Sequence, residues 1–492
     1  MYDLARETPL QGAPLLSGRL GHEVFLKRED MQPVFSFKLR GSYNKIASLS
    51  PAELEKGVIT ASAGNHAQGV AMSAKHLGVR ATIVMGRNTP SIKVDAVKSH
   101  GARAVLFGDG YDEASVHAHE LAERDGMTYI HAYDDKEVIA GQGTVGMEIV
   151  NQHPGRPDVI FVPVGGGGLI AGIAAYTKYL YPQTKIIGVE PQGSDCLAAA
   201  LAKGRRVKLP ADELDLFADG VSVAQIGSET FKVAKEYVDD VVVVSVDEIC
   251  AAIKDVFEET RVIAEPAGAL AVAGMKRYLQ AVETRQSVVA VVSGANVNFD
   301  RLRHISERAE LGEYREAVLA VTIDEEKGSF LKFCRALGKR AITEFNYRYA
   351  GANDPAHVYV GLSVSAPDDR TEVVEGLTSK GYDVLDMTEN EAAKLHVRHM
   401  VGGRQQSEGE ELLYRFEFPE RPGALLQFLG GLGSEWNITL FHYRNHGAAF
   451  GRVLVGFAAS GRDRTKLTKY LKQIGYRYWE ETENPAYRIF LS

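Results

Sequence analysis

The stretch Asp158-Val159-Ile160-Phe161-Val162-Pro163-Val164 leads directly into Gly165-Gly166-Gly167-Gly168-Leu169 and then into Ile170-Ala171-Gly172-Ile173-Ala174-Ala175. The first part is a short β-branched run typical of a buried strand, and the last part is typical of a helix start. Glycines carry no Cβ atoms, so successive backbone N–H groups of the loop can face one anion at the positive end of the helix dipole. The stretch therefore predicts a strand–loop–helix unit of an α/β domain that holds a phosphate on residues 165–169.

The glycine loop alone leaves the phosphate compound open. A Walker A loop would need Gly-Lys-Ser/Thr, and none follows. A dinucleotide fingerprint needs glycine or alanine three places after its second glycine, and Ile170 stands there. Glu190, at the end of the next predicted strand, could imitate the ribose-binding acid, so the dinucleotide alternative is weakened but open. A tightly packed glycine turn is a further alternative.

Similar apolar runs recur up to about residue 310, with helical periodicity between them, at 82–85, 185–189 and 288–292. Strands of this kind are covered on both faces and indicate a parallel sheet. Ligands of such sheets bind beyond the carboxyl ends of the strands, where the polar loops of this chain fall.

Lys38 lies in the stretch Ser36-Phe37-Lys38-Leu39-Arg40-Gly41, after an extended segment (23–27) and before an expected helix start at Ser42. A lone lysine is usually a solvated surface charge. A lysine held among glycine-rich and polar loops is what Schiff-base chemistry with an aldehyde cofactor requires.

Two further loops follow apolar runs. In Ser62-Ala63-Gly64-Asn65-His66, we expect Ser62 to cap a helix and the N–H groups around Gly64 to hold a carboxylate. His66 is either an acid–base group or, more simply, a structural histidine. In Ser293-Gly294-Ala295-Asn296, the serine could meet a heterocycle nitrogen, or the loop is a plain turn.

Composition narrows the function classes. The 492 residues carry a net charge of −8 without a long basic run, which disfavours nucleic acid and anionic membranes as partners. Three cysteines without C-x-x-C spacing fit a reducing compartment, and the polar N-terminus and lack of a long apolar stretch predict a cytoplasmic protein. The histidine pairs 117/119 and 396/399 are expected at the surface, and no metal site is predicted.

The chain repeats itself beyond about residue 315. Residues 342–348 return as 438–444, and 388–390 return as 482–484, with an offset between 94 and 96. Each copy reads strand, helix, strand, strand, helix, strand, which predicts a ferredoxin-like α+β unit. The polar stretch 402–409 is the expected linker.

Together these stretches resemble the fold-type II (tryptophan synthase β-like) pyridoxal-phosphate enzymes, and closely the biosynthetic threonine dehydratases, also called threonine ammonia-lyases. The resemblance rests on Lys27-Arg28-Glu29-Asp30-Met31-Gln32-Pro33, the Lys38 stretch, the 62–66 loop, the glycine loop and the 293–296 loop. The repeat resembles the paired ACT-like modules of the long form. The resemblance implies a pyridoxal-phosphate domain at 1–313 and ACT-like modules at 316–400 and 411–492.

Residue roles follow from the resemblance. Lys38 would be the catalytic lysine that carries pyridoxal 5'-phosphate, with Phe37 beside the cofactor. The remaining cofactor contacts would be Asn65 to the 3-hydroxyl, Gly165, Gly166, Gly167, Gly168 and Leu169 to the phosphate, and Ser293 to the ring nitrogen. Ser62, Gly64 and Asn65 would receive the substrate carboxylate.

The implied reaction is β-elimination of L-threonine to 2-oxobutanoate and ammonia, with L-serine as a second candidate substrate. The implied effectors are isoleucine as inhibitor and valine as its opponent, contacting glycines at helix starts (Gly328, Gly423), and the implied assembly is a homotetramer. Alternatives are a serine dehydratase or racemase, a replacement enzyme that makes cysteine or threonine, and a catalytically inactive amino-acid sensor.

Overall fold

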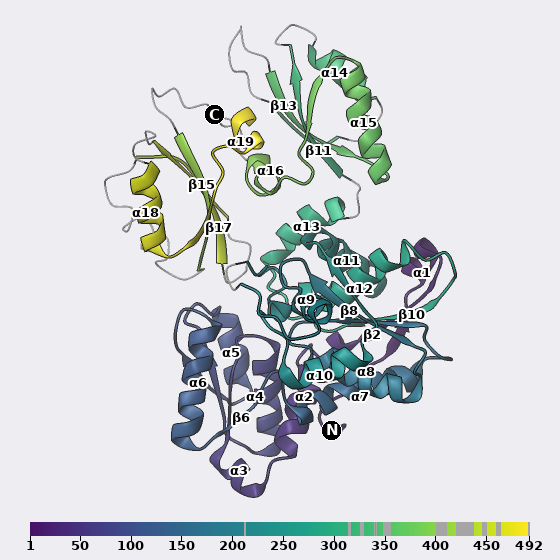
Figure 1. The fold of residues 1–492 in the computed structure, drawn as a ribbon, viewed down its shortest axis with the longest axis vertical. Coiled ribbons are helices and arrows are strands. Elements are labelled where there is room, and N and C mark those ends of the chain that lie inside the picture. Colours follow the sequence, from purple (N-terminus) through teal and green to yellow (C-terminus); the bar gives the residue numbers. More distant parts are fainter. Residues whose placement is uncertain are drawn as a thin grey trace. The chain divides into compact units, whose positions relative to one another are not determined.

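The computed structural model describes residues 1–210, 213–312, 316–324, 329–338, 340, 342–347, 356–399, 411–419, 437–444, 450–458 and 464–490. The chain divides into two compact units, Met1–Ala309 and Glu310–Ser492 (Figure 1). The finer boundaries 1–313, 316–400 and 411–492 stay predictions. The expected linker at 402–409 lies outside the described residues.

The first unit contains two sheets. One has the order β1-β2-β10-β7-β8-β9 and is parallel except for its edge strand β1; the other is parallel with the order β5-β4-β3-β6. The strands are β1 (Leu10–Gly12), β2 (Glu23–Arg28), β3 (Val58–Ala61), β4 (Ala81–Met85), β5 (Arg103–Leu106), β6 (Thr128–Tyr129), β7 (Val159–Pro163), β8 (Lys185–Pro191), β9 (Asp240–Val244) and β10 (Ser287–Val292).

Helices cover both faces of each sheet. They are α1 (Pro14–Leu20), α2 (Lys38–Ala47), α3 (Pro51–Lys56), α4 (Asn65–Leu77), α5 (Ser91–Ser99), α6 (Tyr111–Asp125), α7 (Lys136–Gln152), α8 (Gly168–Leu180), α9 (Cys196–Lys203), α10 (Ser228–Tyr237), α11 (Val246–Thr260), α12 (Pro266–Leu279) and α13 (Arg301–Gly312), with 3-10 turns η1 (Glu29–Met31) and η2 (Asp219–Val221).

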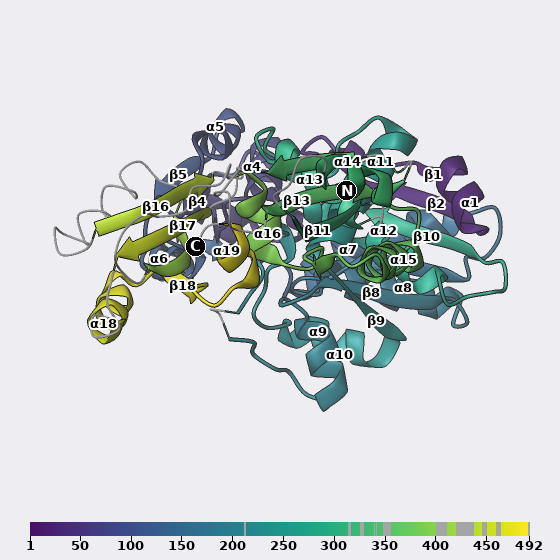
Figure 2. The same ribbon diagram turned by 90° about the horizontal axis from the view of Figure 1, so that it is seen from above.

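The packing of strand β7 on both faces explains why its sequence is apolar throughout. Phe161 packs into a core built with α1, α11 and α12, whereas Ile160 and Val162 pack into a second core with α7, α8, α9 and α10. In Figure 2, α9 and α10 lie on one side of β8 and β9, and α11 lies on the other. Because successive side chains of a strand point to opposite faces, a strand covered twice has no polar face.

The second unit contains two four-stranded antiparallel sheets, ordered β12-β13-β11-β14 and β16-β17-β15-β18. In the first sheet, the first strand in sequence lies between the third and the fourth, as the predicted ferredoxin-like unit requires. The elements are β11 (Glu316–Ile323), α14 (Ser329–Leu337), β12 (Ile342–Tyr347), β13 (Ala356–Ser363), α15 (Pro367–Ser379), β14 (Asp383–Asp386), α16 (Glu391–Leu395), η3 (Val397–His399), β15 (Glu411–Pro419), β16 (Asn437–Arg444), β17 (Phe450–Ala458), α18 (Arg464–Ile474), β18 (Arg477–Glu480) and α19 (Pro485–Phe490).

The repeat is visible in structural detail. The register of β12 shifts between Ile342 and Glu344, and that of β16 shifts at the matching positions, Ile438 and Leu440. The side chains of Thr388 and Thr482 each accept an N–H bond of 3.0 Å from the first strand of their own module. The predicted duplication is therefore confirmed down to a shared β-bulge.

The two modules of the second unit share a small apolar core. Buried residues from both copies meet there, among them Val318, Tyr359, Leu413 and Tyr487. The amide of Asn390 also donates to the Asn484 side chain at 3.2 Å. The second unit is therefore a packed pair of modules.

The start of helix α2 and the burial of His396 differ from the sequence expectations. Helix α2 begins at Lys38 rather than at Ser42, because Phe37 already has helical backbone angles and its carbonyl accepts the Arg40 N–H at 3.0 Å. His396 is buried rather than exposed. In the part of the chain that the structure describes, no helix is long and apolar enough to cross a membrane.

Candidate active site

The loop after β10 is joined to the segment that precedes Lys38. The Phe37 N–H donates to the Ser293 carbonyl at 3.2 Å, and the Ala295 N–H donates to the Phe35 carbonyl at 2.9 Å. These bonds form a short antiparallel bridge between Ser36 and Gly294. Lys38 therefore starts its helix directly beside the Ser293 loop.

The Lys38 amine lies in a half-buried position. Its Nζ donates to the Ala132 carbonyl at 3.1 Å and lies 5.3 Å from the centroid of the Phe37 ring. Burial lowers the pKa of Lys38 to about 8, and the nearby Glu265 carboxylate opposes that shift. An amine with such a pKa is partly neutral near pH 7, as a nucleophile or base must be.

The tetraglycine loop lies at the carboxyl end of β7, and α8 begins at its fourth glycine. Within the described residues, no hydrogen bond uses the N–H groups of residues 165–169. A Cβ on Gly166 would lie 2.2 Å from the Tyr133 ring, so a side chain there is excluded. The loop thus presents backbone donors at a helix N-terminus, which is an anion site.

The loop after β3 also presents donors, but Ser62 is not the helix cap that the sequence predicted. Gly64 is the N-cap of α4, and the Ser62 hydroxyl accepts the Gly64 N–H at 3.2 Å. Among the described residues, no partner accepts the N–H groups of Ala63 and Asn65. His66 is buried against the Ile130 carbonyl at 2.9 Å, which agrees with the structural reading of this histidine.

Ser293 is buried at the end of β10. Its hydroxyl donates to the Ala267 carbonyl at 3.2 Å. A hydroxyl has one hydrogen and can rotate about its Cβ–Oγ bond, so the Ser293 hydroxyl could instead donate to an unprotonated ring nitrogen, which accepts.

Glu265 was missed by the sequence reasoning. It precedes Pro266, the first residue of α12, and its Oε1 accepts the Asn65 amide N–H at 2.5 Å. Burial, followed by the charge of Asp219, raises the pKa of Glu265 to about 7. The available signal was an acid that directly follows the apolar run 262–264 and precedes a helix-starting proline.

Other candidate groups have structural roles. The Glu190 carboxylate accepts the N–H groups of Leu197 and Ala198 at 2.8 and 2.9 Å, so it anchors α9 and does not present itself to a ribose. His117 and His119 stack on Phe107 and Tyr129. Among the described residues, no group of His, Cys, Asp and Glu could hold a metal ion.

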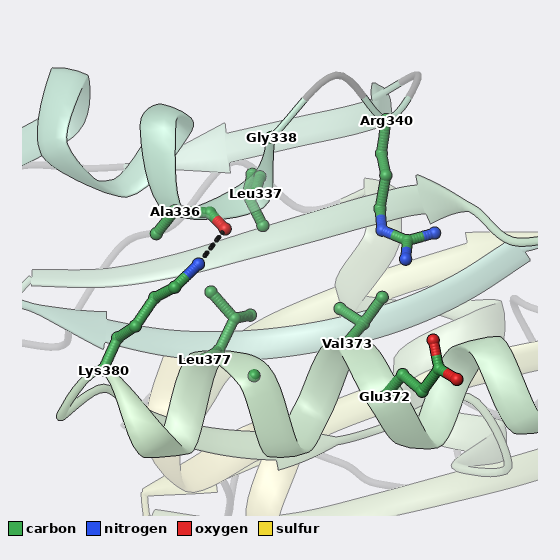
Figure 3. Close-up of a pocket in the computed structure, with 9 residues that line it drawn as sticks. Ala336, Leu337, Gly338, Arg340, Glu372, Val373, Leu377 and Lys380 are labelled. Carbon is green, nitrogen blue, oxygen red and sulfur yellow. Dashed lines mark hydrogen bonds between the residues drawn. The ribbon is translucent and has the colours of Figure 1, made fainter.

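A separate hollow of about 460 Å³ lies in the first module of the second unit (Figure 3). It is lined by the end of α14 and by α15, and the Lys380 ammonium donates to the Ala336 carbonyl at 2.8 Å beside it. The helix starts expected to contact effectors, Gly328 and Gly423, lie outside the described residues.

Comparison with known proteins covers the whole chain. Residues 1–294 match the family of pyridoxal-phosphate dependent enzymes, and residues 307–397 and 402–491 match the C-terminal regulatory domain of threonine dehydratase. The biosynthetic L-threonine dehydratase of Escherichia coli is 53% identical over 100% of this chain and 95% of its own length. The mitochondrial threonine dehydratase of Saccharomyces cerevisiae is 49% identical over 100% of this chain and 87% of its own length.

Solved structures match about three fifths of the chain. The processed form of threonine deaminase isoform 2 from Solanum lycopersicum is 51% identical, with a TM-score of 0.61 over 63% of this chain and 89% of its own. Maize serine racemase is 34% identical, with a TM-score of 0.58 over 61% of this chain and 92% of its own. With the matched regulatory region, these likenesses show that the chain belongs to the biosynthetic threonine dehydratases, pyridoxal-phosphate-dependent lyases with a C-terminal regulatory region.

Proposed function

We propose that this chain converts L-threonine to 2-oxobutanoate and ammonia, as the first step of isoleucine biosynthesis. The reaction removes the β-hydroxyl as water, and the unsaturated amine that results takes up water and releases ammonia. The observation that carries this proposal is likeness along the full chain to threonine dehydratases, both regulatory modules included.

The same observation favours threonine dehydratase over serine racemase. The maize racemase is matched over 92% of its own length but over only 61% of this chain, so more than a third of this chain has no counterpart in it. L-serine remains the second candidate substrate, because it has the same leaving group.

The loops of the first unit fit pyridoxal phosphate. The cofactor carries an aldehyde, a phosphate, a 3-hydroxyl and a ring nitrogen. The matching groups are the Lys38 amine with Phe37 beside it, the N–H groups of Gly165, Gly166, Gly167, Gly168 and Leu169, the Asn65 amide, and the Ser293 hydroxyl. The exclusion of a Cβ at Gly166 supports a loop shaped for backbone donors.

When bound, the cofactor supplies an electron sink that makes the substrate Cα–H bond acidic. Lys38 would then take the Cα proton, since its amine is the base at the meeting point of the loops and has a lowered pKa. The substrate carboxylate would lie on the 62–65 loop, held by Ser62, Gly64 and Asn65. The N–H groups of Ala63 and Asn65, at a helix start, support that placement.

The second unit would sense the pathway product. We propose isoleucine as inhibitor and valine as its opponent, acting on the paired modules. Packing of the two modules over a shared core and the Asn390–Asn484 bond supports a sensor that moves as one body. A homotetramer and a cytoplasmic location complete the proposal.

The decisive experiment compares turnover of L-threonine and L-serine by the purified protein, together with a chirality assay on recovered serine. We expect 2-oxobutanoate from threonine at the higher kcat/KM. D-serine as the main product would favour the racemase instead. Absence of turnover together with isoleucine binding would favour the inactive sensor.

A further inference from the structure

The Asn65 side chain is held from both ends. Its Nδ2 donates to Glu265 Oε1 at 2.5 Å, and its Oδ1 accepts from Asn296 Nδ2 at 2.8 Å. Asn296 Nδ2 also donates to the Val34 carbonyl at 2.8 Å. Val34, Asn296, Asn65 and Glu265 thus form a continuous chain of hydrogen bonds across four segments of the site.

The polarity of this chain is fixed by the backbone carbonyl at its Val34 end. A backbone carbonyl only accepts, so the Asn296 atom that faces Val34 must be its nitrogen. The Asn65 atom that faces this nitrogen must then be its oxygen. The opposite end of the Asn65 amide is its nitrogen, facing the Glu265 carboxylate, which also only accepts when ionised. A flipped Asn65 would place its oxygen against the carboxylate and its nitrogen against an NH₂ group.

An amide nitrogen carries two hydrogens, and Glu265 accepts only one of those on Asn65. The second N–H has no acceptor among the described residues. Resting on the proposed function, we infer that Glu265 and Asn296 are positioning residues that lock the Asn65 amide. The lock directs this second N–H, and not the carbonyl oxygen, toward the 3-oxygen of pyridoxal phosphate.

The surroundings of Glu265 support this role. Gly294 approaches its carboxylate so closely that a Cβ there would lie 2.5 Å from Oε1. The Glu265 N–H donates to the Gly294 carbonyl at 3.2 Å, which ties the start of α12 to the Ser293 loop. Glu265 is 7% exposed, so water cannot readily replace the Asn65 amide as its partner.

The lock is tested by reconstituting the apoprotein with pyridoxal phosphate. The readouts are the dissociation constant, from protein fluorescence, and the absorption maximum of the bound cofactor. Asn296→Ala and Glu265→Leu should each weaken binding about tenfold and shift the absorption maximum, since each removes one bond that orients Asn65. Glu265→Gln, which keeps an accepting oxygen, should restore most of the affinity.

The nearly isosteric variant Asn296→Asp tests the donor-to-acceptor direction of this chain of hydrogen bonds. Asn296→Asp presents oxygens to the Val34 carbonyl and to Asn65 Oδ1, so it should weaken binding more than Asn296→Ala does. Asp255→Asn is the matched control, because Asp255 is a buried acid of the same unit that pairs with Arg19 and Lys276. Its affinity for the cofactor should stay within about twofold of the parent chain.

Repeating these substitutions in an Asn65→Ala variant decides whether they act through Asn65. If Glu265 and Asn296 act through Asn65, their variants should cause no further loss of affinity there. Equal losses with and without Asn65, or no loss in the parent chain, would overturn the inference. Failure of the parent chain itself to bind pyridoxal phosphate would instead refute the proposed cofactor chemistry.

Discussion

The largest fully buried side chains of the two units differ in charge: those of the first include Arg40 and Lys27, and those of the second are aromatic, such as Tyr359 and Tyr414. In the first unit (residues 1–309, the catalytic unit), charged side chains are enclosed in the protein. Arg40 is fully buried, and its guanidinium pairs with Glu29 at 2.8 Å and with Glu148 at 2.5 Å. In the second (residues 310–492, the regulatory unit), duplicated antiparallel sheets share an apolar core.

The difference follows from topology. Parallel strands bring their carboxyl ends to one edge of the sheet, so the loops after β7 and β10 gather polar groups at one site. Antiparallel modules have no such edge, and duplication gives them two equivalent surfaces that can pack on each other. Catalysis and regulation should therefore be separable, and the expectations below, from the largest effect to the smallest, test that separation.

Lys38→Ala should stop catalysis and spare sensing. We expect threonine turnover to fall at least about 10³-fold, because the amine serves as both cofactor anchor and base. Calorimetry should show unchanged isoleucine binding. Lys45→Ala, on the same helix and paired with Asp135 at 2.7 Å, is the control and should stay active. Normal turnover by Lys38→Ala would refute the assignment.

Truncation after residue 313 should have the opposite effect. The shortened chain should still deaminate threonine, and isoleucine should no longer inhibit it. The compactness of the first unit, and solved structures that match only 61% and 63% of this chain, support a catalytic fold that is stable by itself. Steady-state rates with and without isoleucine are the measurement. Inhibition of the truncated chain by isoleucine would show that the repeat is not the sensor.

Arg40→Met should lower the free energy of unfolding of the catalytic unit only. Removing this cation leaves Glu29 and Glu148 buried with less compensation, which costs about 3–5 kcal/mol of unfolding free energy. Urea unfolding followed by fluorescence measures it. Arg124→Ala removes an exposed pair with Asp125 and should leave the midpoint unchanged. Similar midpoints for both variants would show that the buried network does not stabilise this unit.

His66 should make the catalytic unit sensitive to acid. Burial lowers the pKa of His66 from 6.5 to about 3, so the folded protein keeps this ring neutral while the unfolded chain binds a proton below pH 6.5. The contribution of the neutral His66 ring to the free energy of unfolding is thus fully present above pH 6.5. It is lost as the pH falls toward 3, by up to about 1.4 kcal/mol per pH unit. Unfolding at pH 5 and pH 7 should show a smaller drop in His66→Gln than in the parent chain; equal drops would contradict this.

Sequence patterns predicted the scaffold well, because apolar strands and glycine loops are local signals. Strands β2, β4, β7, β8 and β10 lie where the apolar runs placed them, and the repeat was recognised from its nearly constant offset of 94 to 96 residues. Two parallel sheets, rather than one, could not be read from the runs alone, since pairing of strands is a long-range property.

The site was only partly predictable for the same reason. Lys38, Asn65 and Ser293 stand in local motifs that could be recognised. The pairing of Glu265 with Asn65 spans 200 residues, and that of Asn296 with Asn65 spans 231, so no local pattern records them. His396 likewise looked like a surface residue, because burial is set by the whole fold and not by the local sequence.

The most direct test of the account is borohydride reduction of the purified protein, followed by peptide mapping. Reduction fixes the bond between the cofactor and its lysine, so the labelled peptide identifies the residue. We predict one pyridoxyl label, on Lys38, in the peptide that contains the Ser36–Gly41 stretch. A label on another lysine, or no label on protein that turns over threonine, would contradict the account.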